Sequence, residues 1–293
     1  MFRSHLTVTT LAIVGIFCLN TAMERVQAGE PNTPSLRIHG PIQVHHLDDG
    51  RLERGPRNEF NTSNWSGYAI GSYQNGSKYT SASATWAVPA VTFGLTQSAT
   101  NAEYSATWVG IGGFCLNALC SAVDRTLIQL GTSQYVSSSG QTSYFAWYEM
   151  LPANPVQISI NVNPGDNISA SLQCESPCAG KRQNWKLSLT NNTTKQTWTQ
   201  TFSYSSSLAS ADWIEEAPAS SGGVLPLADF SVVGMVPNFG PPNNAPAWNS
   251  LNVSTNGIQM TDPWGQTSDP SGTDANGFNT CYDPPVASSC VSP

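Results

Sequence analysis

The sequence predicts an all-β fold, a sandwich or barrel, between about residues 60 and 260. Short stretches alternate apolar and polar residues with a period of two, as strands with one buried face do. Gly, Pro, Asn and Asp separate these stretches as turns require, and no stretch has a long helical period. Nine tryptophans supply large side chains for a core. A single all-β domain often has this length.

The clearest pair of strands lies at residues 184–190 and 197–204. Trp185, Leu187 and Leu189 share one face of the first stretch, and Trp198 and Phe202 share one face of the second. The polar residues 191–195 between them supply a turn, so a β-hairpin is expected. The same alternation predicts further strands at residues 66–73, 81–88, 156–162 and 167–174.

Two other predicted strands, residues 126–132 and 144–150, each carry one polar side chain on an otherwise apolar face. Gln129 shares a face with Leu127, and Glu149 shares a face with Phe145 and Trp147. If the two strands pair, Gln129 and Glu149 can lie side by side. A carboxylate among apolar rings is costly unless it has a function, so this pair is our candidate for catalysis.

The chemistry follows from the two functional groups. Loss of water around Glu149 would raise the pKa of its carboxyl toward the range where it can take a proton from water. The Gln129 amide keeps its N–H donors at every pH and can bind the oxyanion of a tetrahedral intermediate. The simpler alternatives are a solvent-exposed carboxylate for Glu149 and a core amide satisfied by backbone for Gln129.

Composition excludes several classes of function. The four histidines lie at positions 5, 39, 45 and 46, so from Phe60 onward no imidazole is available for a Ser/His/Asp or Cys/His mechanism or for a metal site. The net charge of −7 and the lack of a basic patch argue against nucleic acid. Charged residues make up only 11% of the chain, which predicts tolerance of acid, although a polar, uncharged surface is also ordinary in secreted β proteins.

Residues 1–28 have the features of a signal peptide: an early arginine, an apolar run and small residues near the expected cleavage point. An uncleaved membrane anchor is the alternative, but threonines interrupt the run. We therefore expect a secreted protein with no membrane segment in the mature form.

Residues 29–59 contain no Phe, Tyr or Trp. They are interpreted as a pro-segment, with a spacer as the alternative. Arg51, Arg54 and Arg57 could pair with carboxylates of the acidic domain. Acid would weaken such pairs, so the segment is a possible inhibitor that acid releases.

Six cysteines remain after removal of residues 1–28, and their close spacings suggest disulfides between Cys115 and Cys120, Cys174 and Cys178, and Cys281 and Cys290. Other pairings stay open, and a zinc site is the competing interpretation. Residues 60–260 are taken as the β-sandwich domain. Residues 261–293, rich in Pro, Gly, Asp and Asn, are expected to form an irregular tail.

Several ordered motifs resemble the glutamic peptidases, or eqolisins. They are NWSGY at 64–68, ATWAVP at 84–89, TWVGIGG at 107–113, LIQLG at 127–131 and YFAWYE at 144–149. The resemblance implies a lectin-like sandwich of two antiparallel sheets, with Gln129 and Glu149 as the catalytic residues and Trp108 as an active-site tryptophan. By itself, Trp108 is more often a core ring. Trp147 and Tyr148, beside Glu149, are further candidates for substrate contact.

The resemblance implies a secreted acid endopeptidase that acts on protein or peptide substrates, is made with a pro-segment and needs no cofactor or metal. A monomer is the default. One position departs from the pattern, because fungal members have Asp where this chain has Gly112. The alternatives are a glycoside hydrolase or sugar-binding protein of the same architecture, and a noncatalytic surface protein.

Overall fold

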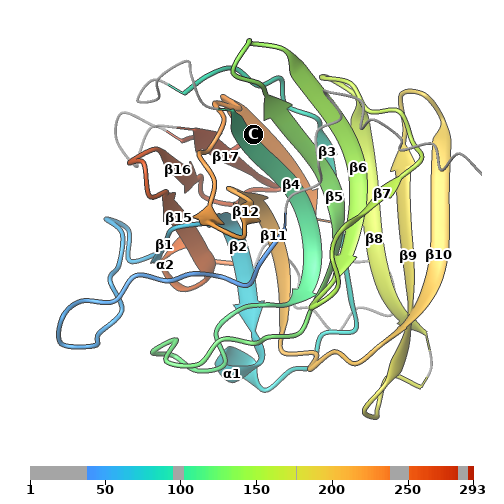
Figure 1. The fold of residues 1–293 in the computed structure, drawn as a ribbon. Helices are drawn as coiled ribbons and strands as arrows, with labels where there is room; N and C mark the ends of the chain where they lie inside the picture. The colour runs from blue at the N-terminus through green and yellow to red at the C-terminus, as the bar shows by residue number, and fades with distance from the viewer. Residues whose placement is uncertain (1–37, 95–101, 176, 238–250, 283–289) are drawn as a thin grey trace, which may run out of the picture. The chain divides into compact units, whose positions relative to one another are not determined.

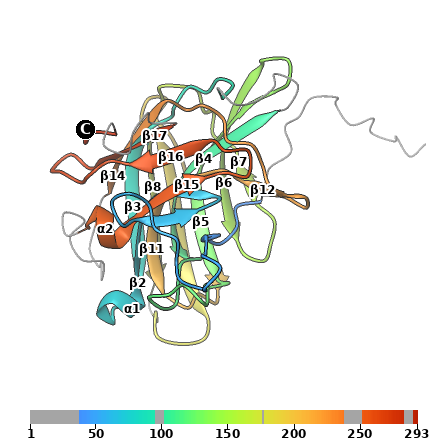
Figure 2. The same ribbon diagram turned by 90° about the vertical axis from the view of Figure 1, so that its left-hand side faces the viewer.

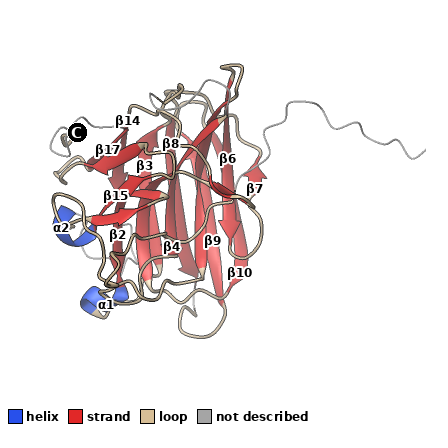
Figure 3. Cartoon of the chain, turned by 60° about the vertical axis from the view of Figure 1, so that its left-hand side comes forward, coloured by secondary structure: helices blue, strands red, loops and turns tan. Residues whose placement is uncertain are grey.

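The structure, a computed structural model, describes residues 38–94, 102–175, 177–237, 251–282 and 290–293. The predicted signal peptide and the first part of the predicted pro-segment lie outside the described residues. Within these ranges nearly all of the regular structure is β-strand, together with two one-turn helices, α1 and α2 (Figure 3). Within the described ranges no helix is long and apolar enough to cross a membrane.

The elements follow the chain in this order: β1 (Phe60–Thr62), β2 (Trp65–Gly71), α1 (Ser72–Asn75), β3 (Ser81–Ala87), β4 (Glu103–Gly112), β5 (Leu127–Val136), β6 (Thr142–Met150), β7 (Val156–Ile158), β8 (Asn167–Glu175), β9 (Gln183–Asn191), β10 (Gln196–Tyr204), β11 (Ser210–Glu216), β12 (Ala219–Ser220), β13 (Gly223–Val224), β14 (Val232–Pro237), α2 (Val253–Asn256), β15 (Gly257–Thr261), β16 (Thr267–Pro270) and β17 (Phe278–Tyr282).

The strands form one curved, mainly antiparallel sheet in the order β10-β9-β8-β3-β14-β17-β16-β15-β2-β11-β4-β5-β6-β7 (Figures 1 and 2). β1 pairs in parallel with β15, and β12 and β13 form a small separate pair. The curvature makes a near barrel or sandwich, which confirms the predicted all-β class. The predicted hairpin is β9 and β10, which pair antiparallel over their full length.

The two halves of the curved sheet pack on a shared apolar core. One half is β10-β9-β8-β3-β14, and the other is β2-β11-β4-β5-β6. Trp86 of β3 donates through Nε1 to Thr132 Oγ1 of β5 at 3.1 Å, and Trp213 of β11 donates to the carbonyl of Ser83 at 3.1 Å. These bonds satisfy the polar ends of buried rings and tie the two halves together.

All three predicted disulfides are confirmed: Cys115 with Cys120, Cys174 with Cys178 and Cys281 with Cys290. The first closes the loop between β4 and β5, and the third ties residue 290 back to β17.

The segment from residue 261 onward, expected to be irregular, instead contributes β16 and β17 to the sheet. β17 lies between β14 and β16, and Phe278, Thr280 and Tyr282 point inward on alternate positions. The alternation was hard to see because polar residues such as Ser268 and Thr280 occupy buried positions. Composition alone therefore understated the extent of the sheet.

Residues 38–59, here called the leading segment, pack directly on the sheet. Isolated bridges join Ile38 to Ala219 and Val44 to Thr62. Ile42 is buried against the same apolar cluster as Trp65, Trp108 and Trp147. The segment therefore covers the face of β2, β11, β4, β5 and β6 that is turned away from the shared core.

Truncating a side chain in the shared core should destabilise the fold strongly. Leu187 of β9 is fully buried, whereas its neighbour Lys186 is exposed. We expect Leu187→Ala to lower the free energy of unfolding by about 2–5 kcal/mol through lost burial and a residual cavity. Lys186→Ala should change it by less than about 0.5 kcal/mol. Denaturant unfolding measures both, and equal effects would place the core elsewhere.

Candidate active site

The candidate site lies on the face of β11, β4, β5 and β6 that the leading segment covers. The strand register aligns Asp212, Gly110, Gln129 and Glu149 in one row across these four strands. Because all four strands are antiparallel neighbours, these positions point to the same side of the sheet. The row therefore places polar side chains among the tryptophans of this face.

Gln129 and Glu149 are directly opposite each other on β5 and β6, as their alternation predicts. Gln129 Nε2 donates to Glu149 Oε2 at 3.0 Å, and both side chains are buried. Burial raises the pKa of Glu149 to about 8, against the opposing effect of bonds from His39 and Gln129. The exposed carboxylate considered for Glu149 is therefore excluded.

A second glutamate at the site, Glu216 at the end of β11, was missed in the sequence. Its Oε2 accepts a hydrogen bond from Trp108 Nε1 at 2.8 Å. The signal was present, because alternation along β11 puts Glu216 on the same face as Ile214 and opposite to Trp213. The strand ends in two adjacent glutamates, Glu215 and Glu216, which alternation directs to opposite faces of the sheet.

The environment of Glu216 strongly favours its protonated form. Burial is the main cause that raises its pKa well above the ordinary value, and the nearby charge of Glu149 raises it further. Hydrogen bonds from Trp108, Trp65 and the backbone N–H of Gly40 act in the opposite direction. Two carboxyls thus influence each other at one buried site, as in sites that perform acid–base chemistry.

The three tryptophan and tyrosine candidates divide between the two faces of the sheet. Trp108 lies at the site beside Glu216, edge-on to Trp65 with ring centroids 4.9 Å apart. Trp147 also lies at the site. Tyr148 does not, because it points to the other face of β6 and packs on Trp198 and Phe202. The prediction that Tyr148 lies at the site is therefore wrong. Successive side chains of a strand point to opposite faces, so Tyr148 cannot share the face of its neighbour Glu149.

A glycine opposite Trp108 allows β4 and β5 to approach each other closely at the site. Gly131 is directly opposite Trp108 on β5, and a Cβ at Gly131 would lie 2.6 Å from Trp108 Cβ and overlap the carbonyl oxygen of Thr107. The lack of a side chain at Gly131 is therefore required by this close approach.

The leading segment places a histidine in the site, although the β-domain itself has none. The His39 ring is fully buried and stacks on Trp147, with ring centroids 3.6 Å apart and an angle of 5° between the planes. His39 Nδ1 is 2.9 Å from Glu216 Oε2. Its backbone N–H donates to Glu149 Oε2 at 3.0 Å, and its carbonyl accepts from Gln129 Nε2 at 2.8 Å.

Side chains of the domain also hold the backbone that follows His39. Trp65 Nε1 donates to the carbonyl of Gly40 at 3.1 Å. Asn64 donates to the carbonyl of Pro41 at 3.0 Å and accepts from the N–H of Gln43 at 2.8 Å. The domain therefore holds residues 40–43 of the segment through their backbone groups.

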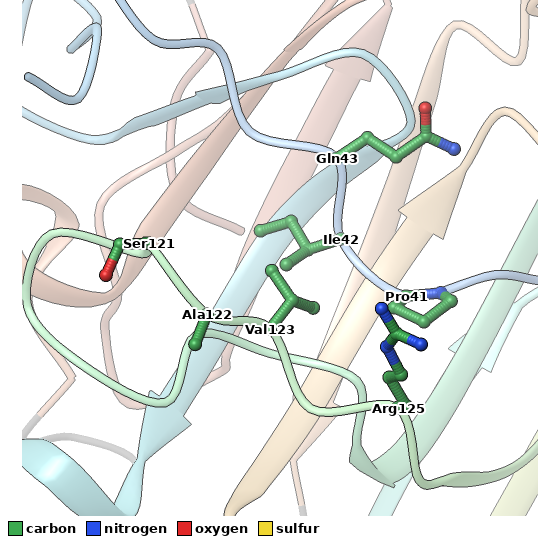
Figure 4. A pocket seen from close by; sticks show the side chains of 7 residues that line it. All are labelled: Pro41, Ile42, Gln43, Ser121, Ala122, Val123 and Arg125. Atoms are coloured by element: carbon green, nitrogen blue, oxygen red, sulfur yellow. The ribbon is translucent and has the colours of Figure 1, made fainter. Parts of the chain in front are cut away.

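Beyond this point the leading segment runs beside the loop between β4 and β5. A hollow opens there between the leading segment and the loop, and it is lined by Pro41, Ile42, Gln43, Ser121, Ala122, Val123 and Arg125 (Figure 4). The N–H of Ile42 donates to the carbonyl of Gly113 at 3.0 Å. This bond ties the segment to the residue that follows β4.

Of the three arginines expected to hold the segment by charge, Arg57 forms an ion pair with the domain. Its Nη2 is 2.7 Å from Asp269 Oδ1. Arg51 pairs instead with Asp49 of its own segment, and Arg54 lies over the ring of Phe60. The charge contacts within the described residues are thus fewer than expected, and the backbone contacts at His39 and Gly40 are more extensive.

The structure explains why this chain has glycine at position 112. Gly112 has φ +94°, and a Cβ there would overlap the carbonyl oxygen of Thr126 and lie 3.0 Å from Asp124 Oδ2. Both the left-handed conformation and the lack of space favour glycine. An Asp would require a different path of the backbone between β4 and the Cys115–Cys120 loop.

Taken together, the all-β fold, the tryptophan-lined cleft and the adjacent Gln and Glu side chains define a hydrolase of the glutamic peptidase type. The Peptidase A4 family matches residues 63–240. The chain is 30% identical over 252 residues to Aspergillopepsin-2 of Aspergillus niger, covering 79% of this chain and 83% of that protein. The chain therefore belongs to the Peptidase A4 family, which confirms the resemblance to the glutamic peptidases.

Among solved structures, the chain is similar to aspergilloglutamic peptidase from Aspergillus niger at 24% identity, with a TM-score of 0.43. That similarity covers 61% of this chain and 99% of the other.

Burial of Glu149 should make the stability of the protein depend on pH. Its pKa is raised from 4.5 to about 8, so the folded state loses stability as pH rises through this window. We expect Glu149→Gln to be more stable than wild type by about 3 kcal/mol at pH 7, and equal to it at pH 4. Denaturant unfolding at both pH values measures the difference. Glu175→Gln, at an exposed position, is the control, and a pH-independent difference for Glu149→Gln would contradict the assignment.

Proposed function

We propose that the protein is a secreted acid endopeptidase that cleaves protein or peptide substrates with a glutamine and a glutamate. The observation that carries the proposal is the hydrogen bond from Gln129 Nε2 to the carbonyl of His39, because a side-chain amide binds a peptide carbonyl there. In this proposal Gln129 stabilises the oxyanion as that carbonyl becomes tetrahedral. No imidazole of the β-domain and no metal takes part.

The path of the leading segment indicates how a substrate lies. With the carbonyl of His39 at Gln129, the peptide bond at the centre of the site joins His39 to Gly40. The catalytic glutamate must take a proton from water and return one to the leaving nitrogen, which corresponds to Gly40 N. The N–H of Gly40 interacts with Glu216, whereas Glu149 accepts the N–H of His39 on the other side of that residue.

The sequence pattern assigns the general base to Glu149, and the backbone path favours Glu216. We therefore assign Glu216 as the base and later acid, and give Glu149 the role of holding Gln129 and the N–H of the residue before the cleaved bond. Both Glu149 and Gln129 stay in contact with the substrate. This arrangement keeps one amide and one proton-transferring carboxyl as the catalytic unit.

The other parts of the proposal rest on the sequence and on the covered cleft. Residues 1–28 direct secretion, and three disulfides suit an oxidising environment. The leading segment is the described part of a pro-segment that inhibits the enzyme by occupying its cleft. Family membership favours this function over the sugar-binding and glycosidase alternatives.

Substitutions separate the roles of the three polar residues. We expect Glu216→Gln to lower kcat about 10³-fold, since a general acid–base group contributes about 10² to 10⁴. Gln129→Ala should lower kcat about 10²-fold or more through loss of the oxyanion donor. Glu149→Gln should raise KM by about tenfold. It should change kcat little, since the amide still accepts the substrate N–H.

Activity is measured on an unfolded protein between pH 2 and 7, after a trace of tagged wild-type enzyme has processed each variant and has been withdrawn. Exposed Glu175 and Gln200 offer matched controls, Glu175→Gln and Gln200→Ala, which should match wild type. Loss of activity in Glu149→Gln together with an active Glu216→Gln would return the base to Glu149. Full activity of all three variants would end the proposal.

A further inference from the structure

We propose that Asn64 is a substrate-binding residue whose side-chain amide pairs with the backbone of the second and fourth residues after the cleaved bond. The enzyme then prefers extended peptides that continue to a fourth residue past that bond. The inference rests on the proposed function, because it names the substrate class that the same site prefers.

Asn64 lies in the short turn that joins β1 to β2, at a fixed place beside the site. Thr62 Oγ1 closes this turn, since it donates to the carbonyl of Trp65 at 2.6 Å and accepts the N–H of Trp65 at 3.1 Å. The carbonyl of Asn64 accepts the N–H of Ala217 at 2.9 Å. Ala217 directly follows Glu216, so the backbone of Asn64 is held relative to the proposed base.

The side chain of Asn64 contacts two backbone groups of the leading segment. Its Nδ2 donates to the carbonyl of Pro41 at 3.0 Å, and its Oδ1 accepts the N–H of Gln43 at 2.8 Å. Only 2% of Asn64 is exposed. In an extended chain, the carbonyl of one residue and the N–H two residues further on point to the same side. A carboxamide has one donor and one acceptor to match them, whatever the side chains are.

Other groups of the domain hold the residues that lie between and before these two. Trp65 Nε1 donates to the carbonyl of Gly40 at 3.1 Å, and the carbonyl of Gly113 accepts the N–H of Ile42 at 3.0 Å. With the two bonds of Asn64, each of the four residues after the proposed cleaved bond is held through a backbone group. A substrate that follows the same path gains all of these bonds only if it continues to the fourth residue.

The side chains on this stretch are less constrained than its backbone. A Cβ added to Gly40 would meet no atom within 4 Å, and Gln43 is exposed. Of the four residues, Ile42 is the buried one. The geometry therefore predicts selection by length and extension on the leaving side, with one apolar side chain at the third position.

Exchange of a single N–H for oxygen in the substrate tests the contact. Two synthetic peptides share one sequence, end after the third residue past the cleaved bond, and carry a terminal N-methyl amide or a methyl ester. The amide alone has the N–H that Asn64 Oδ1 accepts. A control pair ends one residue later, where the exchanged N–H corresponds to Val44. The domain bonds to Gln43 and His45 on either side of Val44, so this N–H points away from it.

For wild type we expect kcat/KM to be about tenfold higher for the amide than for the ester, because the ester leaves a buried acceptor unpaired. The difference should lie in KM, since the contact is remote from the reacting bond. In Asn64→Ala the two peptides should differ by less than about twofold. Asn184 is an exposed asparagine of β9, so Asn184→Ala is the matched control and should keep the wild-type ratio. The control pair should differ by less than about twofold in every protein.

Binding is measured separately from hydrolysis. A recognition site for an added protease replaces exposed residues 48–51 of the full chain, so the leading segment can be cut and removed without self-processing. On a Glu216→Gln background the Kd of each peptide is followed by tryptophan fluorescence, since tryptophans line the cleft. The amide should bind about tenfold more tightly than the ester, and Asn64→Ala should remove the difference.

Equal Kd and kcat/KM for the amide and the ester in wild type would overturn the inference, and this comparison holds even if Asn64→Ala does not fold. A tenfold ratio that persists in Asn64→Ala would also overturn it, because Asn64 would then have only a structural role. If the Kd ratio depends on Asn64 but wild type cleaves neither peptide between pH 2 and 7, the contact stands and the proposed function fails. If wild type cleaves both peptides equally well, only the role of Asn64 fails.

Discussion

The register in which β11, β4, β5 and β6 pair is the constraint on which the site depends. It places Glu149 opposite Gln129 and brings the end of β11 to the same face. A slip of one residue between two of these strands would send their side chains to opposite faces of the sheet. The apolar core on one face and the tryptophans on the other make such a slip costly, so packing of both faces fixes the catalytic geometry.

The same packing makes ionisation of the two glutamates at the site costly. Strands buried on both faces cannot hold ionised carboxylates cheaply, so Glu149 and Glu216 keep their protons to higher pH than in water. Removal of the leading segment would readmit water, and the penalty on ionisation would fall. Covering and uncovering the cleft thus changes the protonation of the catalytic groups as well as their access to substrate.

Period-two alternation was sufficient to predict the all-β class, the β9–β10 hairpin and the juxtaposition of Gln129 and Glu149, because one buried face dictates each of them. It failed where polar residues are buried, as at Thr280 in β17. It also could not bring Glu216 to the site, since Gln129 and Glu216 are 87 residues apart in sequence and meet only through the order β11-β4-β5. Nor could spacing show that residue 39 docks on β6.

The position of His39 is notable because the β-domain itself contains no histidine. A β-domain without histidine keeps no group of its own that changes charge near neutral pH through an ordinary side-chain pKa. The histidine at the cleft belongs to a segment outside that domain, so its proton can act on the fit of the segment without altering the catalytic groups of the uncovered enzyme. An arginine there would carry its charge at every pH, and a phenylalanine would carry none. Of the three, histidine alone has a side chain that gains a charge between neutral and acid pH.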